Sequence, residues 1–386
     1  MLNLTSTRIP SLYGSDRGYS VAADIVTRTA DGRPLDGIWT ELNAVLAMHN
    51  AHRQRLIDFL TFPVTNPVEG ITPSNSGSEF EEASEFGVPK SIRGTASAQW
   101  LGYGFKDYDL AKRFTWKFLR DASAQQVENI HNEAMAADNR NIFRNVMRAI
   151  FNNVNEVATI DNAAVNVYRL YNGDGSVPPA TDTKQFDGTH NHYLVSGGAL
   201  IDSEDLEVLV GHIEEHGFTA SSGVNFVIMV NKAQGAAIRM FKAGETNNNG
   251  KVAMYDFVPS LGEPRFLLPE NRSLVNGSQA PAQIAGMTVI GSYGHALIVE
   301  EDYIPAGYVL CFATGGEANL RNPVGFRQHA DPSYQGLLLI PGDRPGYPLI
   351  DSYYTRGFGT GIRQRGGAAV MQIKASGTYD IPTVWR

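Results

Sequence analysis

The chain has 386 residues, of which 42% are hydrophobic and 19% charged, a balance typical of a folded protein with room for two to three domain-sized units. Its net charge of -8 disfavours a protein that wraps nucleic acid through a basic surface, because such binding depends on neutralising phosphates. A single cysteine, Cys311, excludes an internal disulfide, and no stretch approaches the roughly 18 apolar residues of a membrane span. The N-terminus lacks the pattern of a signal peptide, so we expect no secretion.

The first hundred residues are rich in turn formers. Residues 1–35 are polar, with several glycines and prolines, which predicts an extended arm. Apolar residues then recur at helical spacing over about 37–60, and Asp36 can cap this helix. Residues 62–104 combine many prolines and glycines with a cluster of acids. We therefore expect a long loop or hairpin there that reaches away from the body.

A very long helix is predicted in residues 105–172, which contain neither glycine nor proline. Ser123 and Gln126 fit a capping box, and the helix can run to about Asn152, a length of roughly 45 Å. Its apolar side shifts by nearly half a turn midway, so its two halves should pack on different partners. Two helices broken near Asn139–Asn141 are the alternative.

A strand is predicted directly before this helix. Phe114, Trp116 and Phe118 alternate with the polar residues Thr115 and Lys117, which is the period of a half-buried strand.

The second half of the chain mixes helices and strands. A helix capped by Ser203 should end at Gly217, and a shorter one should run from Asn231 to Phe241. The glycine-rich segment Gly357–Gly361 is interpreted as a close backbone crossing or a bulge. Short apolar runs predict buried strands at 226–230, 287–290, 297–299, 308–312 and 368–373.

Two pairs of histidines resemble metal-binding motifs. His212 and His216 match an H-x-x-E-H zinc pattern, with Glu215 as its acid. They stand at the end of a predicted helix, where histidines are favoured by the negative helix end, and no second motif supplies a third ligand at the family's spacing. His190 and His192 are two residues apart, and on a strand such residues simply share one face. We therefore expect no metal, no cofactor and no catalytic centre.

Six segments carry a resemblance to a known family. They are Phe114–Ser123, Val177–Pro179, Thr189–Tyr193, Gly325–His329, Pro348–Ser352 and Gly357–Gly361. These segments resemble the major capsid proteins of tailed phages with the fold named after phage Hong Kong 97 (the HK97-like fold), most closely those of actinobacterial siphophages. The family's order of arm, extended loop, spine helix, axial domain and return strand matches the order of the predicted elements.

The resemblance implies an α+β, HK97-like phage capsid fold with five parts. These are an N-terminal arm and helix (1–61), an extended loop (62–112), a peripheral domain with the spine helix (113–194), a mixed α/β axial domain (195–350) and a return strand to the peripheral domain (351–386). It also implies a homo-oligomer of hexamers and pentamers that closes into an icosahedral shell around double-stranded DNA, without sequence-specific DNA binding and without a membrane. Scaffolding, portal and decoration proteins are further candidate partners. The virion would be its location, after assembly in the host cytoplasm.

The acidic loop and the spine helix offer candidate contacts between subunits. A loop with little apolar content of its own must bury its surface on a neighbour, so we expect its acids to face a basic row on the helix. The candidates are Glu79, Glu81, Glu82, Glu85, Lys90 and Arg93 in the loop, and Arg140, Arg144 and Arg148 on the helix.

Covalent links between subunits are not expected. Some members of the family join a loop lysine to an asparagine in the last part of a neighbour's chain, but here no asparagine follows Asn322, so Lys90 lacks the expected partner.

Two other functions are alternatives to the capsid subunit. An encapsulin, which is a protein compartment of the same fold, is a second function that the pattern allows. A metallopeptidase built on His212 and His216 is a third.

Overall fold

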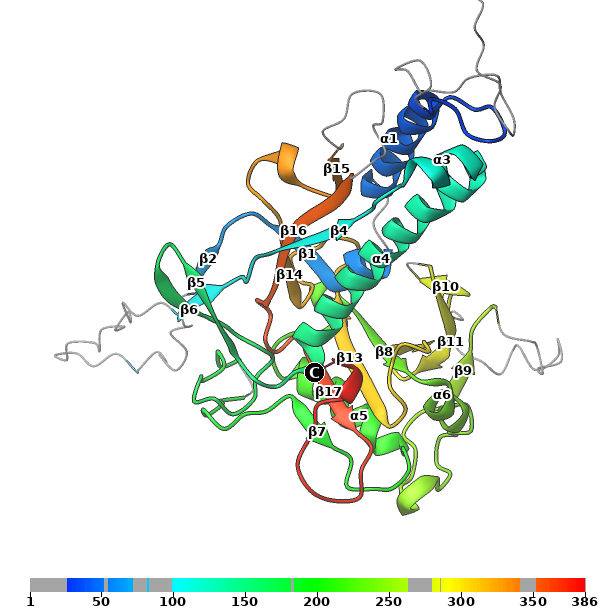
Figure 1. Cartoon of the computed structure of the whole chain (residues 1–386). Coiled ribbons are helices and arrows are strands. Elements are labelled where there is room, and N and C mark those ends of the chain that lie inside the picture. The colour runs from blue at the N-terminus through cyan, green and yellow to red at the C-terminus, as the bar shows by residue number, and fades with distance from the viewer. Residues whose placement is uncertain are drawn as a thin grey trace, which may run out of the picture. The chain divides into compact units, whose positions relative to one another are not determined.

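The computed structural model describes residues 26–51, 55–71, 82, 99–181, 184–262, 280–284, 286–340 and 352–385 (Figure 1). The chain divides into two compact units. The first unit comprises the described parts of 1–51, 108–138 and 336–356, and the second comprises those of 52–107, 139–335 and 357–386. No helix among the described residues is long and apolar enough to cross a membrane.

The first unit is built on helix α1 (Leu35–Ala51). Ile38, Leu42 and Leu46 form its buried stripe, as the helical spacing predicted, whereas Val45 is 42% exposed. The helix starts slightly earlier than expected, so Asp36 lies in its first turn and not at its cap. The remainder of the predicted 37–60 helix is described as a separate helix α2 (Arg55–Leu60) in the second unit, with 52–54 outside the described residues.

The strand predicted around Phe114 is wrong, because residues Trp116–Asp121 form helix α3. The Thr115 side chain accepts a hydrogen bond from Phe118 N at 3.2 Å, which caps the helix. Phe114 and Phe118, four residues apart, stack with ring centroids 5.6 Å apart. The spacing of apolar residues over 114–118 therefore fits a helix as well as a strand, and the hydrogen bond at the Thr115 cap favours the helix.

The long helix is α4 (Ala124–Phe151), a single helix of 28 residues. Both halves of the predicted capping box are present. Ser123 N donates to Gln126 Oε1 at 2.9 Å, and Gln126 N donates to Ser123 Oγ at 3.4 Å. Residues 124–138 belong to the first unit and 139–151 to the second, so the two halves pack in different units, as the shift of the apolar side predicted.

The second unit contains an eight-stranded sheet with the order β10-β11-β12-β8-β13-β17-β7, in which β9 also pairs with β11. The expected strands at 226–230, 287–290, 297–299, 308–312 and 368–373 are all present in it. The bounds are β7 Tyr193–Val195, β8 Asn225–Val230, β9 Phe257–Pro259, β10 Gln283–Ile284, β11 Met287–Tyr293, β12 Ala296–Glu300, β13 Tyr308–Thr314 and β17 Ala368–Gln372.

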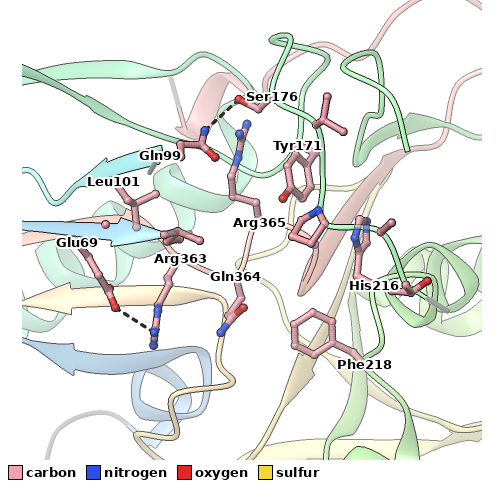
Figure 2. Close-up of a pocket in the computed structure, with 17 residues that line it drawn as sticks. Glu69, Gln99, Leu101, Tyr171, Ser176, His216, Phe218, Arg363, Gln364 and Arg365 are labelled. Carbon is pink, nitrogen blue, oxygen red and sulfur yellow. Dashed lines mark hydrogen bonds and ion pairs between the residues drawn. The ribbon is translucent and has the colours of Figure 1, made fainter. Parts of the chain in front are cut away.

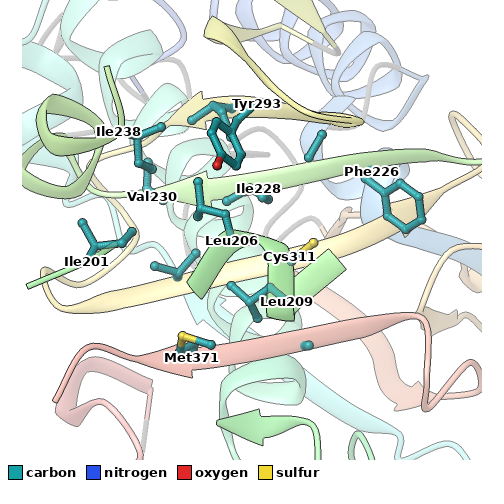
Figure 3. Close-up of a cluster of buried hydrophobic side chains, with 14 of the residues drawn as sticks. Ile201, Leu206, Leu209, Phe226, Ile228, Val230, Ile238, Tyr293, Cys311 and Met371 are labelled. Carbon is teal, nitrogen blue, oxygen red and sulfur yellow. The ribbon is translucent and has the colours of Figure 1, made fainter. Parts of the chain in front are cut away.

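Helix α5 (Ser203–Glu214) covers the core of this sheet (Figure 3). Leu206 and Leu209 are fully buried against strand residues such as Ile228 and Cys311. The N-cap is Asp202, and not Ser203 as predicted. Its carboxylate accepts from Asp205 N at 3.1 Å, and the Asp205 carboxylate accepts from Asp202 N at 3.0 Å.

The ends of α5 and α6 follow simple local signals. Gly217 adopts a φ of +81°, which favours glycine and ends the turn after α5 as predicted. Asn231 caps helix α6 (Lys232–Ile238) through a hydrogen bond from Ala233 N, although the helix ends before the expected Phe241.

The glycine-rich segment lies within strand β16 (Tyr353–Ile362), which the sequence did not predict. In the second unit, β1 (Thr61–Val64) pairs in parallel with β14 (Val324–Arg327), which pairs with the end of β16. In the first unit, β15 (Leu338–Ile340) pairs with the start of β16. The predicted close crossing is confirmed, because a Cβ on Gly359 would lie 1.3 Å from Gly104 O.

Smaller elements complete the two units. Strands β5 (Glu156–Ile160) and β6 (Ala163–Val167) form an antiparallel hairpin. Strand β4 (Lys106–Ala111) pairs with β16. Short 3-10 helices span Ala220–Ser222, Asn248–Gly250, Pro332–Tyr334 and Thr383–Trp385.

Candidate assembly surfaces

The basic row lies on the exposed side of the second half of α4. Arg140, Arg144 and Arg148 are all exposed and one helical turn apart, whereas Val146 and Ile150 are fully buried on the other side. Within the described ranges, none of the three arginines forms an ion pair. The row therefore presents three positive charges that can be paired by an acidic surface from outside the chain.

The extended loop starts and ends as a pair of strands. Strands β2 (Val68–Ile71) and β3 (Gln99–Gly102) are antiparallel, with Glu69 opposite Leu101 and Gly70 opposite Trp100. Trp100 is 62% exposed. Glu79, Glu81, Glu85, Lys90 and Arg93 lie outside the described residues, and Glu82 is described only as exposed. The structure therefore describes the base of the hairpin, whereas the contacts predicted for the charged loop residues stay a prediction.

The hairpin base is held firmly to the second unit. Tyr103 Oη donates to Glu69 Oε2 at 2.9 Å, and Glu69 also pairs with Arg363 at 3.0 Å. Tyr103 is buried, and this burial raises its pKa, so its hydroxyl stays a donor at neutral pH. A Cβ on Gly102 would lie 2.9 Å from the Val165 side chain, which shows how closely the hairpin packs on β6.

A cavity of about 730 Å³ opens beside the hairpin base (Figure 2). Gln99 Nε2 donates to Ser176 Oγ at 3.1 Å on one side of it, and Arg363 pairs with Glu69 on another. Arg365 also lines the cavity. Its guanidinium lies over the Tyr171 ring at 4.5 Å and pairs with Asp174 at 2.8 Å. Burial of Asp174 raises its pKa, but the Arg365 charge and the hydrogen bonds from Ser176 N and Asn155 Nδ2 together outweigh burial, so the pKa of Asp174 is lowered.

His216, at the edge of the cavity, meets two other histidines. The Nε2 atoms of His190 and His192 are 3.1 Å apart, and they lie 3.0 Å and 2.9 Å from His216 Nε2. The His212 ring is a further neighbour, with its centroid 5.6 Å from those of His190 and His192. Burial lowers the pKa of all four histidines, so they are neutral at neutral pH.

Sequence reasoning missed this convergence because it weighed the two histidine pairs separately. The fourth and fifth positions of the H-x-x-E-H pattern lie beyond the helix, since α5 ends at Glu214 and Glu215 is its C-cap. His212 and His216 therefore do not form the one-turn helical pair of a zinc peptidase. The available signal was that four of the nine histidines in the chain fall within 190–216.

Comparison with known proteins identifies the family. The chain is similar to a solved structure from Mycobacterium phage Patience, with 46% sequence identity, 97% of this chain and 98% of that chain covered, and a TM-score of 0.76. The chain belongs to the HK97-like major capsid proteins of tailed phages. No family model and no curated protein sequence matches it.

Two further matches are far weaker. An encapsulin complex from Synechococcus elongatus is 10% identical with a TM-score of 0.43, covering 85% of this chain and 90% of that chain. The capsid of cyanophage P-SCSP1u is 10% identical with a TM-score of 0.40, covering 97% of each chain. Neither carries weight beside the mycobacteriophage relative. This major capsid protein therefore has a structural role in the virion, in a shell made of many copies of the chain.

The capsid protein also exposes apolar side chains on the segment after α6, which sequence reasoning did not single out. Met240 is 75% exposed, Met254 66% and Val252 56%. The segment is held in shape by backbone hydrogen bonds, because Gly244 N donates to Ala253 O at 2.9 Å and Phe257 N donates to Phe241 O at 3.0 Å. These side chains are therefore displayed on an ordered loop.

Proposed function

We propose that this capsid protein forms hexamers and pentamers that close into an icosahedral shell around the double-stranded DNA of a tailed phage, and that it has no catalytic activity. Its 46% identity to the mycobacteriophage protein over 97% of the chain carries this proposal. The net charge of -8 suits a container that must not bind the genome tightly to its wall. Assembly would take place in the host cytoplasm, with scaffolding, portal and decoration proteins as further partners.

We assign the parts of the chain to the roles that the family order suggests. The arm and helix (1–61) and the extended loop (62–112) reach to neighbouring subunits. The peripheral domain (113–194), the axial domain (195–350) and the return strand (351–386) form the body. The exposed Met240, Val252 and Met254 support this assignment, because an apolar surface on the axial domain can be buried against a second copy of the chain.

The acidic loop of one subunit would pair with the arginine row of another. Arg140, Arg144 and Arg148 are exposed and have no ionic partner among the described residues, whereas Glu79, Glu81, Glu82 and Glu85 place four negative charges on one short loop. Each pair at the surface is worth only about 0–1 kcal/mol, but the pairs repeat at every subunit of a closed shell.

A charge exchange tests this pairing. Reversing the row (Arg140→Glu, Arg144→Glu and Arg148→Glu) should abolish the fast-sedimenting shells while leaving soluble subunits. Adding Glu79→Lys, Glu81→Lys, Glu82→Lys and Glu85→Lys to the same chain should restore them, because the attraction is then re-created with opposite signs. Shells that form normally with the row reversed, or that are not restored by the second change, would count against the pairing.

The contents of the particles separate the proposed function from an encapsulin. Particles from infected cells should protect double-stranded DNA from added nuclease. Particles that hold a protein cargo and no protected DNA would instead support the encapsulin alternative.

A further inference from the structure

The orientation of His192 is fixed by a single hydrogen bond. Its Nδ1 lies 2.7 Å from the carbonyl oxygen of Ala368 on β17. A carbonyl oxygen only accepts, so Nδ1 carries the proton and donates. The neutral ring has only one N–H, and therefore His192 Nε2 presents a bare lone pair to His190 and His216.

Hydrogen bonding among the three rings cannot account for their arrangement. Each Nε2 has one in-plane site, which is either an N–H or a lone pair. All three pairs of Nε2 atoms among His190, His192 and His216 are 2.9–3.1 Å apart. If only one of the three Nε2 atoms carries a proton, the two remaining lone pairs face each other. If two of them carry a proton, two N–H groups face each other. In either case at least one of the three close contacts is repulsive. A cation at the centre removes the conflict, because it attracts all three lone pairs at once.

We propose that His190, His192 and His216 bind one divalent transition metal ion, with Zn²⁺ as the occupant, through their three Nε2 atoms. Imidazole nitrogens are preferred ligands of zinc, at about 2.0–2.1 Å. Ligands at that distance in a tetrahedral site lie roughly 3.3 Å apart. The observed triangle is slightly tighter, so a small outward shift of the rings is enough to accommodate the ion.

The surroundings hold the ligands as a metal site requires. The His216 ring is stacked on Phe186 at 4.5 Å and on Tyr171 at 5.5 Å, with interplanar angles of 10° and 18°. The backbone of Gly366 lies against it, since a Cβ there would come within 2.5 Å of the ring. The Ala368 carbonyl orients His192, which is the usual outer support of a metal-bound histidine.

The ion would act as a clamp within the second unit. His190 and His192 lie just before strand β7, and His216 lies just after the C-cap of α5. One ion would join the stretch before β7 to the end of this helix, where Thr181 Oγ1 also donates to Glu215 O at 3.1 Å. Three histidines leave the fourth coordination position to water, which is the arrangement of catalytic zinc sites. Because we propose that this capsid protein has no catalytic activity, the role assigned to the ion is that of a clamp between these two segments.

Metal content of the full-length protein is the direct test. After equilibration with Zn²⁺ and gel filtration, the natural chain should retain about one ion per subunit. His190→Ala should lose it, whereas His295→Ala, which removes an exposed histidine elsewhere, should retain it. His190 is only partly buried, so its removal should leave the circular dichroism spectrum unchanged.

Thermal melting gives a second readout. A chelator should lower the Tm of the natural chain and of His295→Ala, but not that of His190→Ala. If His190→Ala does not fold, His190→Gln is the replacement, because it keeps a polar side chain of similar reach. A natural chain without bound zinc, or equal zinc retention in the His190 and His295 variants, would overturn the proposal.

Discussion

Arg356 Nε lies 2.7 Å from Asp138 Oδ1, and each of these two side chains is only 4% exposed. Asp138 Oδ2 is also 3.0 Å from His49 Nε2, and Arg356 Nη2 donates to Asn50 Oδ1 at 3.2 Å. The buried charges therefore connect α1, α4 and β16 within the first unit.

Removing one member of this pair should destabilise the first unit strongly. Asp138→Asn removes the negative charge beside the buried Arg356 guanidinium, which costs about 3–5 kcal/mol of the free energy of unfolding. Asp121→Asn is the matched control, because Asp121 pairs with Arg120 at the surface, where solvent screens the attraction and its loss should change stability little. Urea unfolding of unassembled subunits measures both. Similar losses in the two variants would contradict the role of the buried pair.

The first unit should also lose stability in acid through His131. This fully buried ring contacts the Tyr354 hydroxyl, and burial, with a smaller contribution from Lys112, lowers its pKa from 6.5 to about 4. The unfolded chain therefore binds a proton more readily than the folded one. Stability contributed by the neutral ring is complete above pH 6.5 and falls as the pH drops towards 4, by roughly 3 kcal/mol at most.

His131→Phe removes the titrating group and keeps the ring between Phe114 and Tyr354. Its free energy of unfolding should fall less steeply than that of the natural chain between pH 6.5 and pH 4, when both are measured by urea unfolding at each pH. Parallel curves for the two proteins would show that His131 does not contribute to the acid sensitivity.

The crossing of β16 over residues 104 and 105 should tolerate no side chain. Gly359→Ala would place its Cβ 1.3 Å from Gly104 O and 3.0 Å from Phe105 Cα, so the strands must separate. We expect insoluble protein or a large loss in Tm. Gly211→Ala is the control, because no atom lies within 4 Å of its added Cβ and alanine favours a helix by about 0.5–1 kcal/mol. A soluble Gly359→Ala chain with an unchanged Tm would refute this packing.

Assembled shells should contain no covalent links between subunits. In the family members that form such links, the lysine bonds to an asparagine in the last part of a neighbour's chain. Here Lys90 has no such partner, because no asparagine follows Asn322. Asn322 itself is fully buried, and its side-chain nitrogen donates to the carbonyl oxygens of Thr61 at 2.8 Å and Gly316 at 2.9 Å. Shells boiled in detergent should therefore run as one band at 42.1 kDa. A ladder of multimers that survives reductant would contradict this prediction.

Local signals predicted the elements whose determinants are local. The capping box at Ser123 and Gln126 and the apolar stripe of α4 lie within one helix, so sequence alone located it. The alternation of apolar and polar residues from Phe114 led to the wrong prediction of a strand, because the same short run also fits a helix. The hydrogen bond from Phe118 N to Thr115 Oγ1 caps the helix that is observed there. Strand β16 was missed because its glycines are explained by the backbone of residues 104 and 105, which is remote in sequence.

The histidine triangle was missed for the same reason. His190 and His192 meet His216 only because β7 pairs with β17 and α5 packs on that sheet, and no spacing in the sequence encodes this. The charged residues proposed for assembly were chosen from sequence, and the structure places only the arginine row on an exposed helical face.

Electron cryomicroscopy of the full-length chain, expressed alone and with the other head proteins of its phage, tests the central claim most directly. Closed icosahedral shells with hexamers and pentamers of this chain are the predicted result. Two features should be visible in the map, namely the tip of each β2–β3 hairpin on an adjacent subunit and the Arg140–Arg148 row covered by that neighbour. Only monomers or open aggregates under both conditions, or hairpins folded back on their own subunits, would contradict the account.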